Sequence, residues 1–345
     1  MPIISEHQLR QMGIALLCAA GVSEMEAQQT IALLIESNLV GHDSHGVIRI
    51  PTYIHQILSG QTRLDAPIEI VKETPTTALV NGGWGLGQVV ATQTMELAVK
   101  KAETHNLGVV STFNCQHIGR MADYVAMAAE KNMIGYCCVN STPGVAPFGG
   151  IQRMFNQSPL GWGIPAGEEP PIILDISTSV CAGGKIAVAR AREEQLPPGC
   201  IIDKEGYPTT DPEDYYRGGA GLPLGGRVGY KGFGLALVVD VLGGLLSGRG
   251  AAYLGGDRGQ GLFQLALKID AYRPIDEFKR EMDALIRAVK TSPCAPGVSE
   301  ILLPGDPERR MKVERQQNGI PISSQTWNAL VETGTKVQVD VMSFL

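Results

Sequence analysis

The sequence predicts an α/β protein with helices at both ends of the chain. Strand-like and helix-like segments alternate between residues 107 and 140, which is typical of an α/β core. The first forty residues and the last quarter carry the 3.6-residue apolar spacing of helices. The 345 residues contain no internal repeat and no low-complexity linker, and their number is typical of roughly two domains.

Two helices are predicted over the first forty residues. Each has a serine followed three residues later by Gln or Glu at its start, and a glycine at its end. Helical spacing resumes at about Val47, with Pro51 near the first turn of the new helix. The capping residues of the first two helices are Ser5, Gln8 and Gly21, and then Ser23, Glu26 and Gly41.

The middle of the chain alternates between strand and helix patterns. Two short strands are predicted within 66–80, separated by a turn, and a glycine-rich turn leads into a helix near 88–105. The expected strands that follow are 108–113, 133–140, 171–177 and 261–270, and the expected helices are 118–132, 185–194, 231–248, 276–290, 306–319 and 323–334. We therefore expect residues 1–75 and 300–345 to pack together as a mainly helical domain. Residues 76–299 would form an α/β domain.

The composition excludes several classes of function. The net charge is −6 and no basic block occurs, so the chain lacks the electrostatic signature of nucleic-acid binding. The longest apolar stretch, 235–246, is too short to span a bilayer and contains Asp240. The N-terminus lacks an apolar signal core. Seven cysteines, several within apolar runs and none in a CxxC pair, indicate free buried thiols. We expect a cytoplasmic protein.

The segment GHDSHGVIRIP, residues 41–51, concentrates groups that can do chemistry. A metal site, a polar helix end and a proton-transfer site are the three interpretations. The spacing of His42, Asp43 and His45 is not a standard zinc pattern, so we expect no metal. His45 titrates near neutral pH, and Arg49, four residues later, would share a helix face with it and grip a carboxylate. This combination favours a substrate that carries a carboxylate beside a carbon that gains or loses a proton.

Three further segments carry weaker signals. His117, Gly119 and Arg120 follow a predicted strand and would open a helix whose free amides suit a phosphate; a capping histidine is the alternative. Asp175 ends a buried strand, and either binds a ligand or caps the next helix. Lys231 lies between glycines at a helix start. No GxGxxG follows a predicted strand, so the Rossmann fingerprint is absent. These residues alone indicate an α/β enzyme with an acid–base histidine and an anionic ligand.

The order of the motifs resembles the type 2 malate/L-lactate dehydrogenase family. That family includes ureidoglycolate dehydrogenase, diketogulonate reductase, sulfolactate dehydrogenase, Δ1-piperideine-2-carboxylate reductases and a hydroxycarboxylate dehydrogenase. HIGR and PPGCIID look closest to the hydroxycarboxylate branch. The resemblance implies an NAD(P)-binding α/β fold unrelated to the Rossmann fold, and a homodimer with the active site near the subunit interface. It implies that residues 1–75 and 300–345 form the substrate and dimerisation domain, and that residues 76–299 form the cofactor-binding domain. The motifs, in chain order, are HDSHGVIRIP, QHIGR, VAPFGG, LDISTS with GK, PPGCIIDKEGYPTTDP, YKGFGLALVVDVLGG and LLPGDPERR.

The resemblance also implies a role for each cluster. His45, preceded by Ser44, matches the proton donor and acceptor of the family, and His117 a second active-site histidine. Arg49 matches the contact to the substrate carboxylate. Asp175 would orient an imidazole or touch the cofactor. The positions that match cofactor contacts are Gly119, Arg120, Met121, Ser141, Leu174, Asp175, Ile176, Ser177, Tyr230, Lys231, Gly305, Asp306, Pro307 and Glu308.

Three departures bear on specificity. Most members carry Phe-Gly-Thr-Asn-Pro where this chain has Phe155-Asn156-Gln157-Ser158-Pro159, in a loop that lies near substrate in the family. Gln157 and Ser158 are therefore candidate substrate contacts, and we expect an unusual substrate. Tyr230 replaces the usual histidine before Lys-Gly, and Gln116 replaces the first histidine of a common His-His pair.

The sequence thus predicts an NAD(P)-dependent oxidoreductase of 2-hydroxy or 2-oxo acids. NAD is favoured over NADP, because Asp306 and Glu308 would repel a 2′-phosphate, although Arg309 and Arg310 are adjacent. Three alternatives remain: a reductase of a cyclic imine carboxylate, a catalytically inactive dimeric member, and a metal-dependent hydrolase or lyase.

Overall fold

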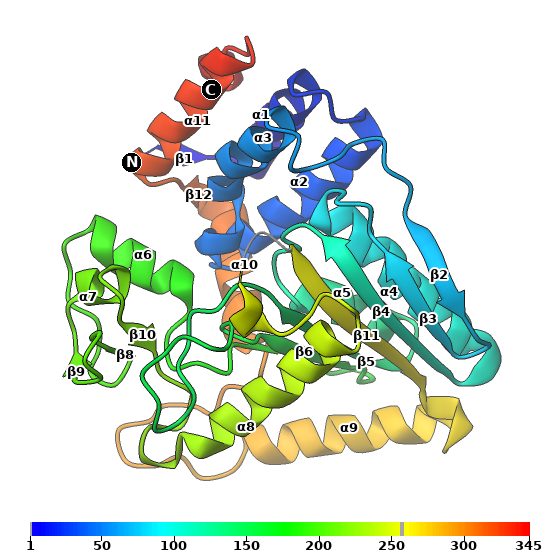
Figure 1. Ribbon diagram of the computed structural model, residues 1–345. Coiled ribbons are helices and arrows are strands. Elements are labelled where there is room, and N and C mark those ends of the chain that lie inside the picture. The colour runs from blue at the N-terminus through cyan, green and yellow to red at the C-terminus, as the bar shows by residue number, and fades with distance from the viewer. Residues whose placement is uncertain (1, 256–258) are drawn as a thin grey trace.

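The computed structural model describes residues 2–255 and 259–345. Figure 1 shows a central sheet, a helical unit in which the two ends of the chain meet, and a small lobe built from the 180–220 region. The predicted α/β class with packed terminal helices is confirmed. The proposed division at residues 75 and 300 stays a prediction.

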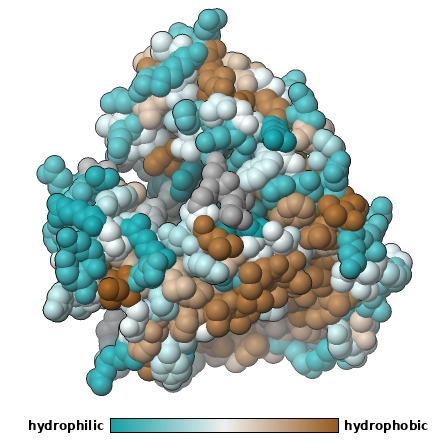
Figure 2. Space-filling model, viewed as in Figure 1, coloured by the Kyte–Doolittle hydropathy of each residue, from teal (hydrophilic) through white to brown (hydrophobic). Residues whose placement is uncertain are grey.

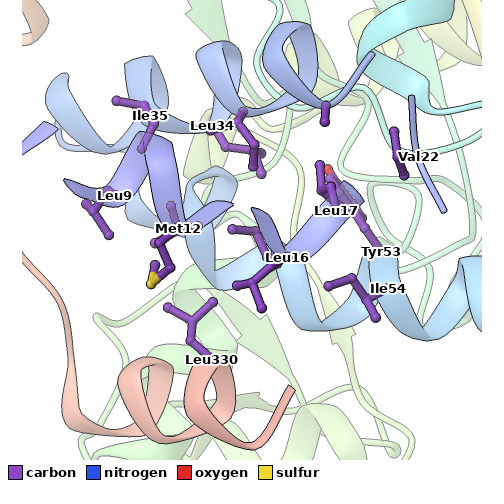
Figure 3. Close-up of a cluster of buried hydrophobic side chains, with 14 of the residues drawn as sticks. Leu9, Met12, Leu16, Leu17, Val22, Leu34, Ile35, Tyr53, Ile54 and Leu330 are labelled. Carbon is purple, nitrogen blue, oxygen red and sulfur yellow. The ribbon is translucent and has the colours of Figure 1, made fainter. Parts of the chain in front are cut away.

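The helical unit joins the N-terminal and C-terminal helices around one apolar core (Figure 3). Its members are α1 (Glu6–Ala19), α2 (Glu24–Leu39), α3 (Ile50–Leu58) and α11 (Ser324–Lys336), with α10 (Asp306–Asn318) packed on α2. The strands β1 (Ile3–Ile4) and β12 (Ile320–Pro321) pair antiparallel and bring the two ends of the chain together. Completely buried side chains such as Leu9, Ile31 and Leu330 come from three different helices of this core.

Local capping explains where the first helices begin and end. Ser5 forms the full predicted capping box with Gln8, and the Ser23 hydroxyl accepts a hydrogen bond from the backbone N–H of Glu26. Gly21 and Gly41 adopt φ values of 98° and 86°, which side chains disfavour, so both helices stop where the sequence predicts.

The central sheet has seven strands in the order β2-β3-β4-β11-β5-β6-β7. Among the described residues of this sheet, β3 and β4 pair parallel and the other neighbouring strands pair antiparallel, so the sheet is mixed. Strand β11 arrives from late in the chain and lies between β4 and β5, which are joined by α5. The strands are β2 (Glu69–Glu73), β3 (Thr77–Asn81), β4 (Leu107–Cys115), β5 (Met133–Asn140), β6 (Leu160–Ile164), β7 (Ile172–Ile176) and β11 (Gln260–Lys268).

Helices α4 (Gly87–His105) and α5 (Ala122–Glu130) pack on the sheet, mainly against β4, β11 and β5. A second apolar cluster, with Tyr136, Cys138 and Val239, lies between strands and α8 (Tyr230–Val239). Residues Asp240–Leu245 continue α8 as a π-helical segment. The sequence predicts one continuous helix there. Helix α9 (Ile275–Lys290) forms as predicted, whereas β6 was not predicted.

The small lobe contains a three-stranded sheet with its own core. Strands β10 (Ala220–Gly221), β8 (Ile201–Ile202) and β9 (Pro208–Thr209) pack with α6 (Gly183–Ala191) and α7 (Pro212–Tyr216). All seven cysteines are free, and five are buried. Among the described residues, none of the helices has the length and apolar character needed to cross a membrane.

Candidate active site

Two stacked imidazoles mark the centre of the candidate site. His45 lies in the 3-10 turn Asp43–His45 after α2, and His117 lies in the segment that follows β4. Their ring centroids are 5.6 Å apart, with an angle of 18° between the planes. The Ser44 Oγ contacts His45 Nδ1 at 3.0 Å, and the Tyr53 hydroxyl contacts His117 Nδ1 at 2.7 Å. The two predicted histidines, 72 residues apart in sequence, therefore lie side by side.

Neighbouring side chains hold the turn that carries His45. Asn38 Nδ2 donates to the Asp43 carboxylate at 2.7 Å, and Asn38 Oδ1 accepts from the Val47 backbone at 2.8 Å. Arg315 on α10 donates to both oxygens of Asp43, at 2.6 and 3.0 Å. Gly46 is required because a Cβ there would lie 2.1 Å from Asn38 Oδ1. Asp43 is therefore part of a clamp between α2 and α10.

The three polar residues considered as metal ligands have different partners. His42 Nε2 contacts Glu308 at 3.2 Å, Asp43 binds Arg315, and His45 contacts Ser44. Within the described ranges, no group of three His, Cys, Asp or Glu side chains is arranged to hold a metal ion.

Arg49 reaches the site by a route that the sequence did not predict. The extended backbone of Gly46 separates two 3-10 turns, so His45 and Arg49 do not share a helix face. Instead the Arg49 side chain folds back and its Nε donates to the Ser44 carbonyl at 2.7 Å. Its two Nη groups have no hydrogen-bond partner in the part of the chain that the structure describes. The guanidinium therefore presents an open fork suited to a carboxylate.

Burial and positive charge keep both imidazoles neutral. Burial, with Arg49 as the next cause, lowers the pKa of His45 to about 3. The pKa of His117 also lies well below its ordinary value, because of burial and then of Arg49. A neutral imidazole can accept a proton from a hydroxyl group, so the pair suits general acid–base chemistry near neutral pH.

The segment after His117 is not the start of a helix. Helix α5 begins at Ala122, and the backbone N–H of Ala122 donates to Asp175 Oδ2 at 3.0 Å. The expected helix start at 118 is therefore wrong, and the capping histidine with it. Asp175 caps α5 from β7, whereas Ala182 is at the N-cap of the helix that follows Asp175 in the chain. The Asp175 carboxylate thus occupies an amide that would otherwise be open to a phosphate.

Arg120 is a buried cation with unused donors. Its side chain is 7% exposed, and Nη2 donates to Asp123 at 3.1 Å. Nε and Nη1 are buried without a hydrogen-bond partner within the described residues. Burial raises the pKa of Asp123 against the opposing effect of Arg120. Unused cationic donors of this kind fit an anionic cofactor group.

The loop at residues 156–158, which departs from the family pattern, contacts the segment that follows β7. The Gln157 carbonyl accepts from Ser177 Oγ at 2.9 Å, and its side-chain Oε1 accepts from the Ser179 hydroxyl. Ser158 is 1% exposed, with φ at 44° and its hydroxyl on the Asn156 carbonyl. A Cβ on Gly184, in the first turn of α6, would approach the Ser44 Cβ at 2.9 Å, so the start of α6 lies against the His45 turn.

The remaining predicted cofactor positions lie around the rim or further away. Gly305 has φ at 95° and precedes α10, where Asp306 binds Arg309 and Lys290, and Glu308 meets His42. Leu174 and Ile176 flank Asp175 on β7, Met121 is buried beside Gly161, Pro307 is in the first turn of α10, and Ser141 follows β5. Tyr230 and Lys231 begin α8, exposed to solvent, and Tyr230 packs edge-on against Phe148. Neither hydrogen-bonds to the histidine pair in the described structure.

Sequence reasoning missed two members of the site. Tyr53 on α3 and Gln88 in the first turn of α4 form a hydrogen-bonded pair, with Gln88 Nε2 donating to the Tyr53 hydroxyl at 2.8 Å. Tyr53 follows Arg49 by four residues, which is a detectable spacing. Gln88 carries no local signal, because its role depends on contacts between α3, α4 and the segment after β4.

The comparisons with known proteins agree with one another. The family model described as malate/L-lactate dehydrogenase matches residues 4–331. A malate dehydrogenase of Pyrococcus horikoshii is 37% identical, over 98% of this chain and 96% of its own. An L-sulfolactate dehydrogenase of Methanocaldococcus jannaschii is 35% identical, over 99% of both chains. The solved structure of a Δ1-piperideine-2-carboxylate reductase from Pseudomonas syringae superposes with a TM-score of 0.83 at 25% identity, covering 96% of this chain and 100% of its own.

Proposed function

Because this chain belongs to the malate/L-lactate dehydrogenase family, we propose that it interconverts a small 2-hydroxy acid and its 2-oxo acid, with His45 as the acid–base and Arg49 as the carboxylate anchor. Membership of the family supports a nicotinamide-dependent hydroxy acid dehydrogenase, without specifying the substrate or the roles of the residues. The observation that carries the proposal is the neutral, stacked histidine pair beside the open Arg49 fork.

Arg49 binds and orients the substrate in this proposal. Its Nε is held by the Ser44 carbonyl, so the guanidinium is fixed relative to the residue next to His45. A carboxylate on the two Nη groups then places the adjacent carbon against the imidazole pair. The same carboxylate offsets the Arg49 charge, which is one cause of the low pKa of His45. Substrate binding therefore makes a protonated His45 less costly.

His45 moves the proton. In the oxidation direction, its neutral imidazole accepts the hydroxyl proton, while Ser44 Oγ accepts a hydrogen bond from Nδ1. In the reduction direction, the protonated ring returns that proton to the developing alkoxide. When bound, the nicotinamide cofactor accepts or supplies the hydride.

The chain's own residues fit an anionic dinucleotide. Arg120 offers buried, unused donors near His45 and Asp175. We propose Gly119 to Met121, Ser141, Leu174 to Ser177, Tyr230, Lys231 and Gly305 to Glu308 as cofactor contacts, and Gln157 and Ser158 as substrate contacts. NAD(H) is favoured because Arg309 and Arg310 are paired with Asp306 and Glu300. These cations are therefore not free for a 2′-phosphate.

We also propose a homodimer built on an exposed apolar face of α8 and the π-helical segment. Figure 2 shows a band of apolar residues over this part of the molecule. Exposed apolar areas of this kind mark interaction sites. The face consists of Leu235, Leu237, Val238, Val241, Leu245 and Leu246, each 42–56% exposed.

A second candidate function is reduction of a cyclic imine that carries a carboxylate. The structural similarity to Δ1-piperideine-2-carboxylate reductase favours it, and the same histidine and arginine would serve. A catalytically inactive dimeric member is a third alternative. Reduction of a 2-oxo acid and reduction of a cyclic imine differ in the atom that receives the proton, oxygen or nitrogen. A test of both kinds of substrate therefore distinguishes these two functions.

The deciding experiment follows the loss of reduced-nicotinamide absorbance with NADH and NADPH in parallel. The substrates are 2-oxo acids of different size and charge, with piperideine- and pyrroline-2-carboxylate. We expect turnover with a 2-oxo acid and NADH, and a fall of about 10²–10⁴-fold in His45→Ala with cofactor binding retained. Turnover of His45→Ala at the unmodified rate would contradict the acid–base role. Turnover of imines alone would establish the second candidate.

A further inference from the structure

Two buried residues form a hydrogen-bonded chain that ends at His117, with Tyr53 in contact with the ring and Gln88 in contact with Tyr53. The Tyr53 hydroxyl lies 2.7 Å from His117 Nδ1 and 2.8 Å from Gln88 Nε2. Tyr53 is 3% exposed and Gln88 is 1% exposed, whereas His117 is only partly buried. Tyr53 belongs to the helical core, where it lies near Leu17 and Ile54 (Figure 3). The hydroxyl is therefore held in place by packing.

The direction of these hydrogen bonds follows from counting protons. A phenol has one proton, so it can donate to only one of its two partners. The Gln88 amide donates to Tyr53 through Nε2, which leaves Gln88 Oε1 without a partner in the described residues. The reverse orientation would leave a buried N–H group unpaired, and such groups are rarer than unpaired carbonyls. Tyr53 therefore donates to His117 Nδ1.

We infer that Tyr53 and Gln88 are positioning residues that hold neutral His117 with its proton on Nε2. In this tautomer His117 presents an N–H donor to the substrate oxygen and polarises the carbonyl, while proton transfer belongs to His45. The inference rests on the proposed function and deepens it, because it divides the work between the two histidines.

The contrast with His45 supports this division. The Nδ1 of His45 contacts only a serine hydroxyl, at 3.0 Å. A hydroxyl rotates to donate or to accept, so the Ser44 contact does not fix the tautomer of His45 and stays satisfied when the ring gains or loses a proton. The Nδ1 of His117 faces a phenol whose acceptor side is already used by Gln88. Burial raises the pKa of Tyr53 to about 12, so the phenol keeps its proton near neutral pH.

The test is nitrogen NMR of ¹⁵N-histidine-labelled full-length protein, without substrate. His117→Asn identifies the His117 signals by their loss. We expect Nε2 of His117 to be protonated and Nδ1 not. Tyr53→Phe should give a mixture of tautomers. Gln88→Glu should move the proton to Nδ1, because a carboxylate accepts the Tyr53 proton and leaves the phenol oxygen to accept from the ring. Tyr136→Phe, which removes a hydroxyl from a different cluster, should leave the tautomer unchanged.

Kinetics provide the second measurement. With a substrate from the panel, kcat/KM of Tyr53→Phe should fall by about ten- to a hundred-fold, because the oxygen loses a fixed donor. The inference is overturned if His117 is protonated on Nδ1 in the unmodified protein. It is also overturned if the His117 tautomer is the same in Tyr53→Phe and Gln88→Glu as in the unmodified protein. If the tautomers behave as expected but the whole panel gives no turnover, the proposed function fails while the positioning role of Tyr53 and Gln88 stands.

Discussion

The Arg49 guanidinium has two roles in the proposed site, one toward His45 and one toward the substrate, and a single substitution tests both. The guanidinium lowers the pKa of the imidazole, after burial as the largest cause, and it offers the carboxylate contact. A cation disfavours the imidazolium, so removing it must raise the pKa of His45 from about 3 toward its ordinary value of 6.5.

We predict that Arg49→Met moves the acid limb of kcat/KM for hydroxy acid oxidation to higher pH. The limb reports protonation of His45 in the free enzyme, and protonation removes the base. KM for the substrate should rise at least tenfold through loss of the charged contact. The measurement is a pH–rate profile, with Arg10→Met, which removes an ion pair with Glu6 on α1, as control. An acid limb at the same pH in Arg49→Met would show that Arg49 does not act on His45.

At the scale of elements, the active turn depends on a clamp between helices far apart in sequence. Arg315 on α10 binds Asp43, and Asn38 on α2 binds both Asp43 and Val47. This clamp explains why the GHDSHG segment carries polar residues with no contact to the imidazole pair. The clamp positions the turn, so its loss should affect activity and stability together.

We predict that Arg315→Met lowers the free energy of unfolding by about 1–3 kcal/mol, because it leaves Asp43 without its charged partner. Turnover should fall with it, since the His45 turn loses its anchor to α10. The measurements are urea unfolding and kcat. Lys336→Met, which removes an exposed pair with Glu332, should change stability by less than about 0.5 kcal/mol. Equal effects of the two substitutions would argue against the clamp.

Element boundaries show how far local chemistry reaches. Ser5, Ser23, Gly21 and Gly41 act through neighbours within a few residues, so the sequence alone places the first two helices correctly. The predicted start of α5 is wrong because its cap, Asp175, lies 53 residues after Ala122, on another element. A cap supplied by tertiary structure leaves no local signal.

At the scale of the molecule, the proposed homodimer rests on the exposed apolar face of α8 and the π-helical segment. We predict that Leu245→Asp shifts the protein from dimer to monomer, because a charge would have to be desolvated in the interface. Light scattering after gel filtration measures the mass. Leu58→Asp, on an exposed part of α3, is the matched control and should leave the dimer intact. A monomeric unmodified protein would contradict the dimer, and a dimeric Leu245→Asp would place its interface elsewhere.

The sequence by itself determined the α/β class, most helices and strands, and the candidates His45, Arg49 and His117, because periodicity, caps and motif order are local properties of the chain. The tertiary structure alone decided the insertion of β11 between β4 and β5, the fold-back of Arg49 onto the Ser44 carbonyl, and the Tyr53–Gln88 pair behind His117. The β11 insertion and the Tyr53–Gln88 pair arise from packing between elements far apart in the chain. The fold-back of Arg49 arises from the extended backbone of Gly46, which interrupts the helical periodicity that the sequence pattern predicts.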